Sequence, residues 1–204
     1  MRGLVALLAV ALLAGCSSDD DGPDVLVVGD SITDMSREAI IGAVADDQIE
    51  LRIEAVPGAT STQMRERVTP LAGEVGEQVV INLGTNDIIG GRDPAETAVE
   101  IAALVDQHPG VRCVHVTTVN PGVVTFVDAD VDQQVIAFNL GMFDLERQRL
   151  HVNVIDWAGA LADPPDGGVA TDYLEDDGIH PNEAGTQLLA RLYAEALASC
   201  KGAP

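Results

Sequence analysis

The sequence predicts an α/β fold with a five-stranded parallel sheet. Five short runs rich in Val, Leu and Ile lie between residues 24 and 155, and longer segments with helical spacing separate them. Strands that alternate with helices in this way form a parallel sheet through right-handed crossovers. The length of 204 residues and the apolar content of 47% suit one domain with a sizeable core. No internal repeat or low-complexity linker divides the sequence.

The five expected strands are short and are bounded by turn-forming residues. They cover residues 24–28, 49–56, 78–83, 111–119 and 152–155. In a parallel sheet all carboxyl ends lie at one edge, and open α/β sheets bind their ligands there. The residues that follow each strand are therefore the first candidates for a functional site.

Helical signals fill the intervals between the strands. Residues 32–41 read as a helix that starts at Ser31, and residues 61–75 and 94–105 follow, the latter led by Asp93 and Pro94 as N-cap and first-turn residues. The last expected helix covers residues 182–198. Between these lies a stripe of apolar residues spaced four, three, four and three apart, which we assign to a core-facing helix and not to a cofactor site: Val131, Val135, Phe138, Met142 and Leu145.

The first 23 residues are expected to lie outside the folded domain. A basic start, an apolar run at residues 4–13 and a final Leu-Ala-Gly-Cys form a signal-peptide pattern. Its end resembles the lipobox of prokaryotic lipoproteins. The resemblance implies a signal peptide at residues 1–15, lipidation of Cys16, a flexible tether at 16–23 and a folded domain at 24–204.

The protein would then be exported and would face the outside or the periplasm. Its lipid would be its only membrane attachment, because the apolar run is too short to span a bilayer. The alternative is an ordinary secretory peptide in which Cys16 is incidental.

The charge balance excludes one class of partner. The chain has 33 acidic and 11 basic residues, a net charge of −22, so it repels nucleic acid phosphates. The acidic run Asp19-Asp20-Asp21 is expected to be a solvated part of the tether, and we assign it no calcium site.

Polar turn sequences follow the strands in chain order. They are Gly29-Asp30-Ser31, Pro57-Gly58-Ala59-Thr60, Gly84-Thr85-Asn86-Asp87, Asn120-Pro121-Gly122 and, beyond the fifth strand, Asp177-Gly178-Ile179-His180-Pro181. Each alone is a common turn or cap signal, and Ser31 could serve merely as a helix N-cap. Their ordered placement after successive strands indicates one shared site.

The residue types at this edge suit nucleophilic catalysis. Ser31 is the candidate nucleophile, His180 the base, and Asp177 the group that orients the imidazole. The backbone N–H groups of Ser31 and Gly58 and the side-chain amide of Asn86 are candidate oxyanion donors.

These residues resemble the motif blocks of the SGNH (GDSL-type) hydrolases. The blocks match at Gly29-Asp30-Ser31, Gly58, Gly84-Thr85-Asn86-Asp87 and Asp177-Gly178-Ile179-His180. Gly58 is the least specific match, and Ile32 stands where many members have Leu. The resemblance covers residues 24–197. It implies a flavodoxin-like three-layer α/β/α sandwich, ester hydrolysis without a metal or other cofactor, and a loop-shaping role for Asp30 and Asp87.

The sequence therefore predicts an exported serine esterase whose substrate is an acylated glycan or lipid, with short acyl groups such as acetyl favoured. The run Val154-Ile155-Asp156-Trp157 also resembles SGNH domains that handle O-acetylated envelope glycans. Two alternatives stay open: acyl transfer to envelope glycans, and a non-catalytic lipoprotein that binds glycan or lipid. A monomer is expected. His108, His115 and His151 are expected to be structural or solvated.

Cys113 and Cys200 remain once Cys16 is assigned to lipidation, and export implies an oxidising compartment. Cys113 lies near the amino end of the fourth strand, whereas His180 must lie at the carboxyl edge to reach Ser31. The last helix runs back from His180 for roughly 27 Å, which exceeds a typical strand length of about 17–20 Å. We therefore predict a Cys113–Cys200 disulfide. The alternative is a buried Cys113 and a solvated Cys200 that never meet.

Overall fold

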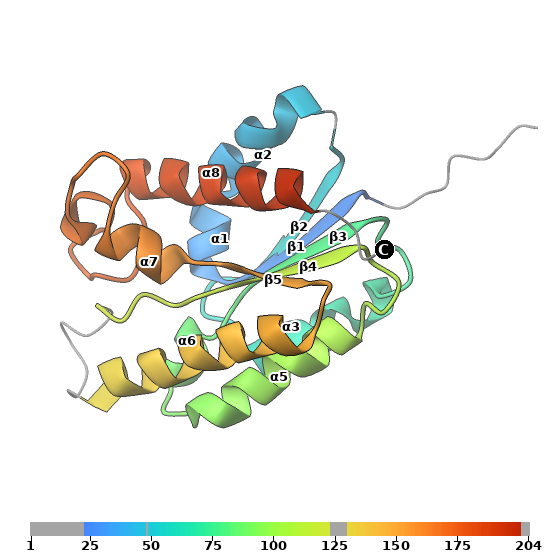
Figure 1. The fold of residues 1–204 in the computed structure, drawn as a ribbon, viewed down its shortest axis with the longest axis horizontal. Coiled ribbons are helices and arrows are strands. Elements are labelled where there is room, and N and C mark those ends of the chain that lie inside the picture. Colours follow the sequence, from blue (N-terminus) through green and yellow to red (C-terminus); the bar gives the residue numbers. More distant parts are fainter. Residues whose placement is uncertain (1–22, 48, 123–129, 201–204) are drawn as a thin grey trace, which may run out of the picture.

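One all-parallel sheet forms the centre of the molecule in the computed structural model, which describes residues 23–200 except 48 and 123–129 (Figure 1). Its strands are β1 (Val25–Gly29), β2 (Leu51–Ala55), β3 (Gln78–Asn82), β4 (Cys113–Thr117) and β5 (Val152–Ile155). Their spatial order is β2-β1-β3-β4-β5. This is the flavodoxin-like order, and it confirms the predicted fold class.

Helices cover both faces of the sheet, so the fold has three layers (Figure 1). One face carries α2 (Arg37–Val44), α7 (Trp157–Ala162) and α8 (Glu183–Ser199). The other carries α3 (Ser61–Val68), α5 (Pro94–Asp106) and α6 (Asp130–Gln148). The remaining helical pieces are short: α1 (Ser31–Met35), α4 (Thr85–Ile89), η1 (Ala45–Asp47), η2 (Thr69–Leu71) and η3 (Ala170–Asp172).

The strand β1 shows why the runs are continuously apolar. Leu26 and Val28 pack into the core on the α3/α5/α6 face, whereas Val25 and Val27 pack into the core on the α2/α7/α8 face. Because successive side chains of a strand point to opposite faces, a strand between two helical layers buries both sets. The stripe on α6 is also buried core, as expected: Val131, Val135, Phe138, Met142 and Leu145.

One expected helix is interrupted, and another ends earlier than the periodicity predicts. The helix over 32–41 is broken at Ser36, whose hydroxyl donates to the carbonyl of Ile32 at 2.8 Å and separates α1 from α2. The helix over 61–75 ends at Val68, and Pro70 lies in the following 3-10 turn, where its missing N–H costs no helical hydrogen bond. The short helices α4 and α7 were not predicted.

The start of β4 and the end of α8 meet at the amino edge of the sheet. Cys113, the first residue of β4, forms a disulfide with Cys200, the C-cap of α8, with their Cα atoms 6.0 Å apart. This is the pairing that the helix-length argument predicts. Cys16 and the expected signal peptide lie outside the described residues. Within the described part of the chain, none of the helices combines the length and the apolar character needed to cross a bilayer.

Candidate active site

The site lies where the order of the sheet reverses. β1 pairs with β2 on one side and with β3 on the other, so the chain leaves β1 and β3 in different directions. Ser31 is separated from β1 by Asp30 alone, and Asn86 lies in α4, just after β3. Such a switch point is where open α/β sheets form their ligand crevice.

Ser31 is the first residue of α1, but it does not cap that helix. The carboxylate of Asp30 is the N-cap and accepts the backbone N–H of Ile32 at 3.0 Å. The interpretation of Ser31 as a mere N-cap is therefore wrong. Its hydroxyl instead lies 2.9 Å from Nε2 of His180.

His180 connects Ser31 to Asp177. Its Nδ1 lies 2.6 Å from Oδ2 of Asp177. The other oxygen, Oδ1 of Asp177, accepts the backbone N–H groups of Ile179 at 2.8 Å and His180 at 2.9 Å. Burial raises the pKa of Asp177, but the His180 side chain and these two N–H donors outweigh that effect and lower the pKa below its usual value. The carboxylate is therefore ionised at neutral pH and can stabilise an imidazolium.

The chain segment around His180 is held by its own backbone and by a side chain from the loop after β4. Leu174 and Pro181 form an isolated antiparallel bridge, and the N–H of Glu175 donates to the carbonyl of His180 at 2.8 Å. Asn120, just beyond β4, donates from Nδ2 to the carbonyl of Gly178 at 3.2 Å. Gly178 has a φ of 68°, a conformation that favours glycine. The sequence marked Asn120 only as part of a turn, and no signal in it indicated this contact.

Asn86 holds three loops together. Its Nδ2 donates to Oδ2 of Asp30 at 3.0 Å and to the carbonyl of Ala59 at 3.1 Å. Its amide is thereby fixed next to the carboxylate that caps the helix of Ser31. Gly58 lies one residue before Ala59 in a solvent-exposed turn with a φ of 76°. The structure thus brings the loops of all three expected oxyanion donors to the same edge of the sheet.

The two other acidic residues of the motifs are buried and shape loops. Burial raises the pKa of Asp30 to about 6, against the lowering effects of the Ile32 N–H and of His180. Asp87 accepts the backbone N–H of Ser61 at 2.8 Å and its hydroxyl at 2.7 Å, and it pairs with Arg92 at 3.2 Å. Asp87 therefore ties α4 to the start of α3, at a distance from the Ser31–His180–Asp177 chain of hydrogen bonds.

The remaining histidines take no part in this arrangement. His108 and His115 are almost completely buried, and burial lowers the pKa of both, for His115 to about 4. His151 lies at the opposite edge, just before β5. Among the residues that the structure describes, three neighbouring side chains could together ligate a metal ion: Cys113, His115 and Cys200, which lie at the amino edge of the sheet, opposite Ser31.

Comparison with known proteins gives one family match. The model of the GDSL-like lipase/acylhydrolase family matches residues 27–188. No curated protein matches the sequence significantly.

Several solved structures share the fold. A GDSL-like lipase from Bacteroides thetaiotaomicron is 19% identical, with a TM-score of 0.69 over 88% of each chain. An acetylxylan esterase from Geobacillus stearothermophilus is 16% identical, with a TM-score of 0.70 over 86% of this chain and 94% of the other. The catalytic domain of peptidoglycan O-acetyltransferase A from Streptococcus pneumoniae is 18% identical, with a TM-score of 0.62 over 88% of this chain and 92% of the other.

Proposed function

The chain belongs to the GDSL-like lipase/acylhydrolase family, and from this premise we propose that it is a serine esterase that removes short acyl groups, such as acetyl, from a larger alcohol. The observation that carries the proposal is the hydrogen-bonded chain from Ser31 through His180 to Asp177. Serine, imidazole and carboxylate in this order are the parts that an acyl-enzyme mechanism needs.

The distances define a role for each atom. Oγ of Ser31 attacks the ester carbonyl carbon while Nε2 of His180, 2.9 Å away, accepts its proton. Asp177 stabilises the imidazolium through Nδ1. When the tetrahedral intermediate collapses, the C–O bond to the alcohol breaks and the leaving oxygen takes the proton from Nε2. Water then attacks the acyl-serine by the same proton route and releases the acid.

The oxyanion requires donors that are in place before the reaction begins. We assign this role to the N–H groups of Ser31 and Gly58 and to the amide of Asn86. The hydrogen bonds from Asn86 to Asp30 and to the carbonyl of Ala59 hold the amide at this edge before a substrate arrives. Because they use both Nδ2 hydrogens, the oxyanion would take over one of these two bonds. All these groups belong to one chain, which supports a monomer as the catalytic unit.

The acetyl preference rests on the fold neighbours. Two of them are named as an acetylxylan esterase and a peptidoglycan O-acetyltransferase, and the chain has the same fold at 16–18% identity. Acyl transfer to an envelope glycan is the second candidate function, and the O-acetyltransferase neighbour favours it. A protein that only binds glycan or lipid would not need the hydrogen-bonded arrangement of Ser31, His180 and Asp177.

A labelling and turnover experiment tests the proposal. The purified domain should react with a serine-directed phosphonate at Ser31 and should hydrolyse p-nitrophenyl acetate faster than longer-chain p-nitrophenyl esters. Ser31→Ala is the matched control and should do neither. If the wild-type domain showed neither labelling nor turnover, the non-catalytic interpretation would replace the esterase.

A product balance separates hydrolysis from transfer. With a glycan acceptor present, a hydrolase releases one acetate for each p-nitrophenol. A transferase releases less acetate, and the difference appears as acetylated glycan. A deficit of acetate would therefore favour the second candidate function.

We also propose that the protein is exported and held at the membrane by a lipid on Cys16, with residues 24–204 as the catalytic domain. The signal-peptide pattern that ends in Leu-Ala-Gly-Cys supports this localisation. In cells, the wild-type chain should stay in the membrane fraction, and Cys16→Ser should lack the lipid. Recovery of the wild-type chain as a freely secreted, unlipidated protein would contradict the proposal.

A further inference from the structure

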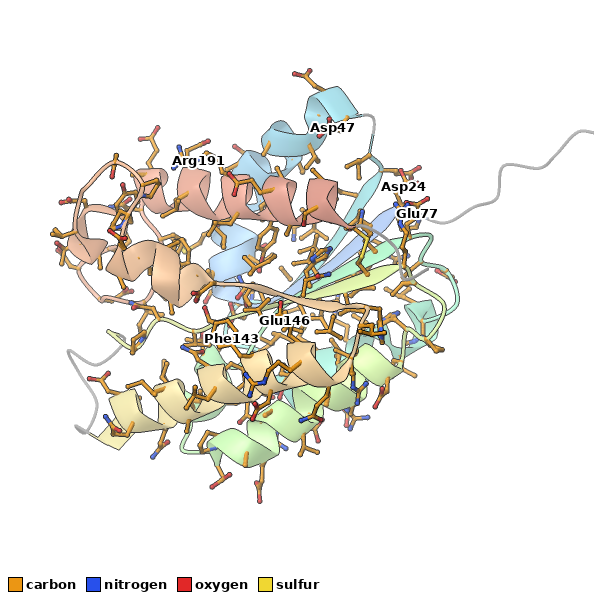
Figure 2. All side chains as sticks on the ribbon, viewed as in Figure 1. Asp24, Asp47, Glu77, Phe143, Glu146 and Arg191 are labelled. Atoms are coloured by element: carbon orange, nitrogen blue, oxygen red, sulfur yellow. A yellow bond between two sulfur atoms is a disulfide. The ribbon has the colours of Figure 1, made fainter. Side chains whose placement is uncertain are left out.

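A buried group of metal-ligand side chains surrounds the disulfide. Cys113 and His115 lie two residues apart on β4, and Cys200 ends α8 beside them. One donor atom from each of the three residues lies within 4.8 Å of those of the other two. Cys113 is 3% exposed and His115 is not exposed at all. The carboxyl-terminal end of α8 points to the sheet edge at which Asp24 and Glu77 are labelled in Figure 2, opposite the candidate active site.

The structure fixes the tautomer of His115 through Gln78 on β3. Nε2 of the Gln78 amide donates to the carbonyl of Leu197 at 3.4 Å, so its Oε1 is the atom that faces His115. Nε2 of His115 lies 2.9 Å from this Oε1. Because Oε1 can only accept, Nε2 of His115 must carry the hydrogen, and Nδ1 must carry a free lone pair.

In the disulfide form, the lone pair on Nδ1 of His115 accepts no hydrogen bond from the described residues. Nδ1 of His115 is buried and has no hydrogen-bond partner among the described residues. A buried acceptor without a partner is unfavourable and calls for an explanation. A neutral imidazole whose other nitrogen donates to a fixed oxygen has the arrangement that metal-binding histidines adopt.

We propose that the dithiol form of the protein binds a thiophilic d¹⁰ metal ion, such as Zn²⁺, through Sγ of Cys113, Sγ of Cys200 and Nδ1 of His115. Two thiolates and one imidazole suit such an ion, and zinc completes its coordination with water where the protein supplies three ligands. Every copy of the chain passes through the dithiol state, because the disulfide forms only after synthesis. The site and the disulfide exclude each other, because both use the same two sulfurs.

The chemistry of the exchange balances with a phosphine reductant. Reduction breaks the S–S bond: the phosphine gives two electrons, takes oxygen from water to become the phosphine oxide, and leaves a proton on each sulfur. Metal binding then releases these two protons to solvent, since the thiolate is the ligand. The site lies at the edge opposite Ser31, so it does not depend on the proposed esterase function.

A metal titration of the full folded domain tests the proposal. The protein is reduced with a phosphine without oxygen, titrated with Co²⁺ and followed through its thiolate-to-cobalt charge-transfer absorption. Zn²⁺ should displace the cobalt and raise the melting temperature of the reduced protein. We expect one ion per reduced chain and none for the oxidised chain. Absence of this absorption from the reduced protein, or equal binding by the oxidised protein, would overturn the proposal.

Variants identify the ligands. Cys200→Ser and His115→Gln should each weaken binding by at least the roughly 10–100-fold that loss of an outer-shell partner usually causes. His151→Ala, at the same edge of the sheet, is the matched control and should bind like the wild type. Unchanged affinity in folded His115→Gln would refute the third ligand. Should His115→Gln fail to fold, ¹⁵N-histidine spectra of the reduced wild type decide: the Nδ1 resonance of His115 must shift when Zn²⁺ is added, and an unshifted resonance refutes the site.

Discussion

Two carboxylates at this site each make hydrogen bonds to more than one group of the protein. Asp177 orients the imidazole of His180 with Oδ2 and caps two backbone N–H groups with Oδ1. Asp30 caps α1 with one oxygen and accepts the amide of Asn86 with the other. The carboxylates thus fix the loops and the electrostatics together, so that substitutions at these positions should affect more than one property.

Asp177→Asn separates the two tasks of that carboxylate. The amide can still present an oxygen to the N–H groups of Ile179 and His180, but its NH₂ then faces Nδ1 of His180 and favours the wrong tautomer. We expect kcat for p-nitrophenyl acetate to fall by on the order of 10⁴. Steady-state kinetics of Asp177→Asn, Ser31→Ala and the double variant provide the measurement. The double variant should be about as slow as Ser31→Ala alone, because the residues act as a unit; multiplicative losses would contradict the assignment.

Asp30 should make the folded protein less stable as the pH rises. Its folded pKa of about 6 lies above the ordinary value of 3.8, so between these values the folded state holds a proton that the unfolded state has lost. The contribution of Asp30 to stability is therefore fully present below pH 3.8 and is lost as the pH rises through 6. The total change is on the order of 3 kcal/mol.

Urea denaturation at pH 4 and pH 7 checks this dependence on Asp30. The free energy of unfolding of wild type relative to Asp30→Asn should fall between the two pH values, because asparagine does not titrate. The exposed Asp46→Asn variant is the control and should follow the wild type. A wild-type minus Asp30→Asn difference that does not change with pH would contradict the raised pKa.

At the scale of elements, the site depends on how strand ends and loops connect. β1 supplies the turn to Ser31, β3 leads to Asn86, and β4 leads to Asn120, which reaches across to the loop of His180. The amide oxygen Oδ1 of the Asn120 side chain also accepts the N–H of Gly122 at 3.1 Å, so its own loop orients it. Asn120 is thus a link between β4 and the segment that carries the base.

Asn120→Ala should displace the His180 loop without removing any reacting group. We expect kcat to fall by roughly 10–100-fold with little change in KM, since small misplacements of a catalytic group are costly. Kinetics with p-nitrophenyl acetate test this, and Asn153→Ala on β5, away from the loop, is the control. A pure rise in KM would instead make Asn120 a substrate contact.

At the scale of the whole molecule, the two edges of the sheet have separate roles. The carboxyl edge holds the candidate active site, and the amino edge holds the disulfide that ties the end of α8 to β4. Between the two edges, a cluster of buried hydrophobic side chains packs against each face of the sheet. Stability and catalysis should therefore respond independently to changes at opposite edges.

Cys200→Ser should destabilise the domain without reducing its activity. The disulfide joins residues 87 positions apart, and opening so long a loop should cost about 2–4 kcal/mol of unfolding free energy. Denaturant unfolding and ester turnover of the same variant below its melting temperature provide the two measurements. If kcat of Cys200→Ser also fell under conditions in which the variant is fully folded, the two edges of the sheet would be coupled. Unchanged stability would contradict the stabilising role that we assign to the disulfide.

The strands, the parallel sheet and the motif residues at its carboxyl edge could all be predicted from the sequence. These follow from local patterns, because a short apolar run between turns predicts a strand, and parallel strands must end at one edge. The length of the last helix places its end at the level of Cys113, and this predicted the disulfide between Cys113 and Cys200. Ser31, His180 and Asp177 could be named because their residue types and their order after the strands carry the chemistry.

Which of these residues are in contact, and what surrounds them, could not be predicted before the fold was known. The contact of Asn120 with Gly178 joins positions 58 apart, and that of Asn86 with Asp30 joins positions 56 apart. The raised pKa of Asp30 and the unpartnered nitrogen of His115 depend on burial by several elements at once. Local periodicity encodes which face of an element is buried. It does not encode which polar atoms from distant segments meet there, because packing of the whole chain selects those partners.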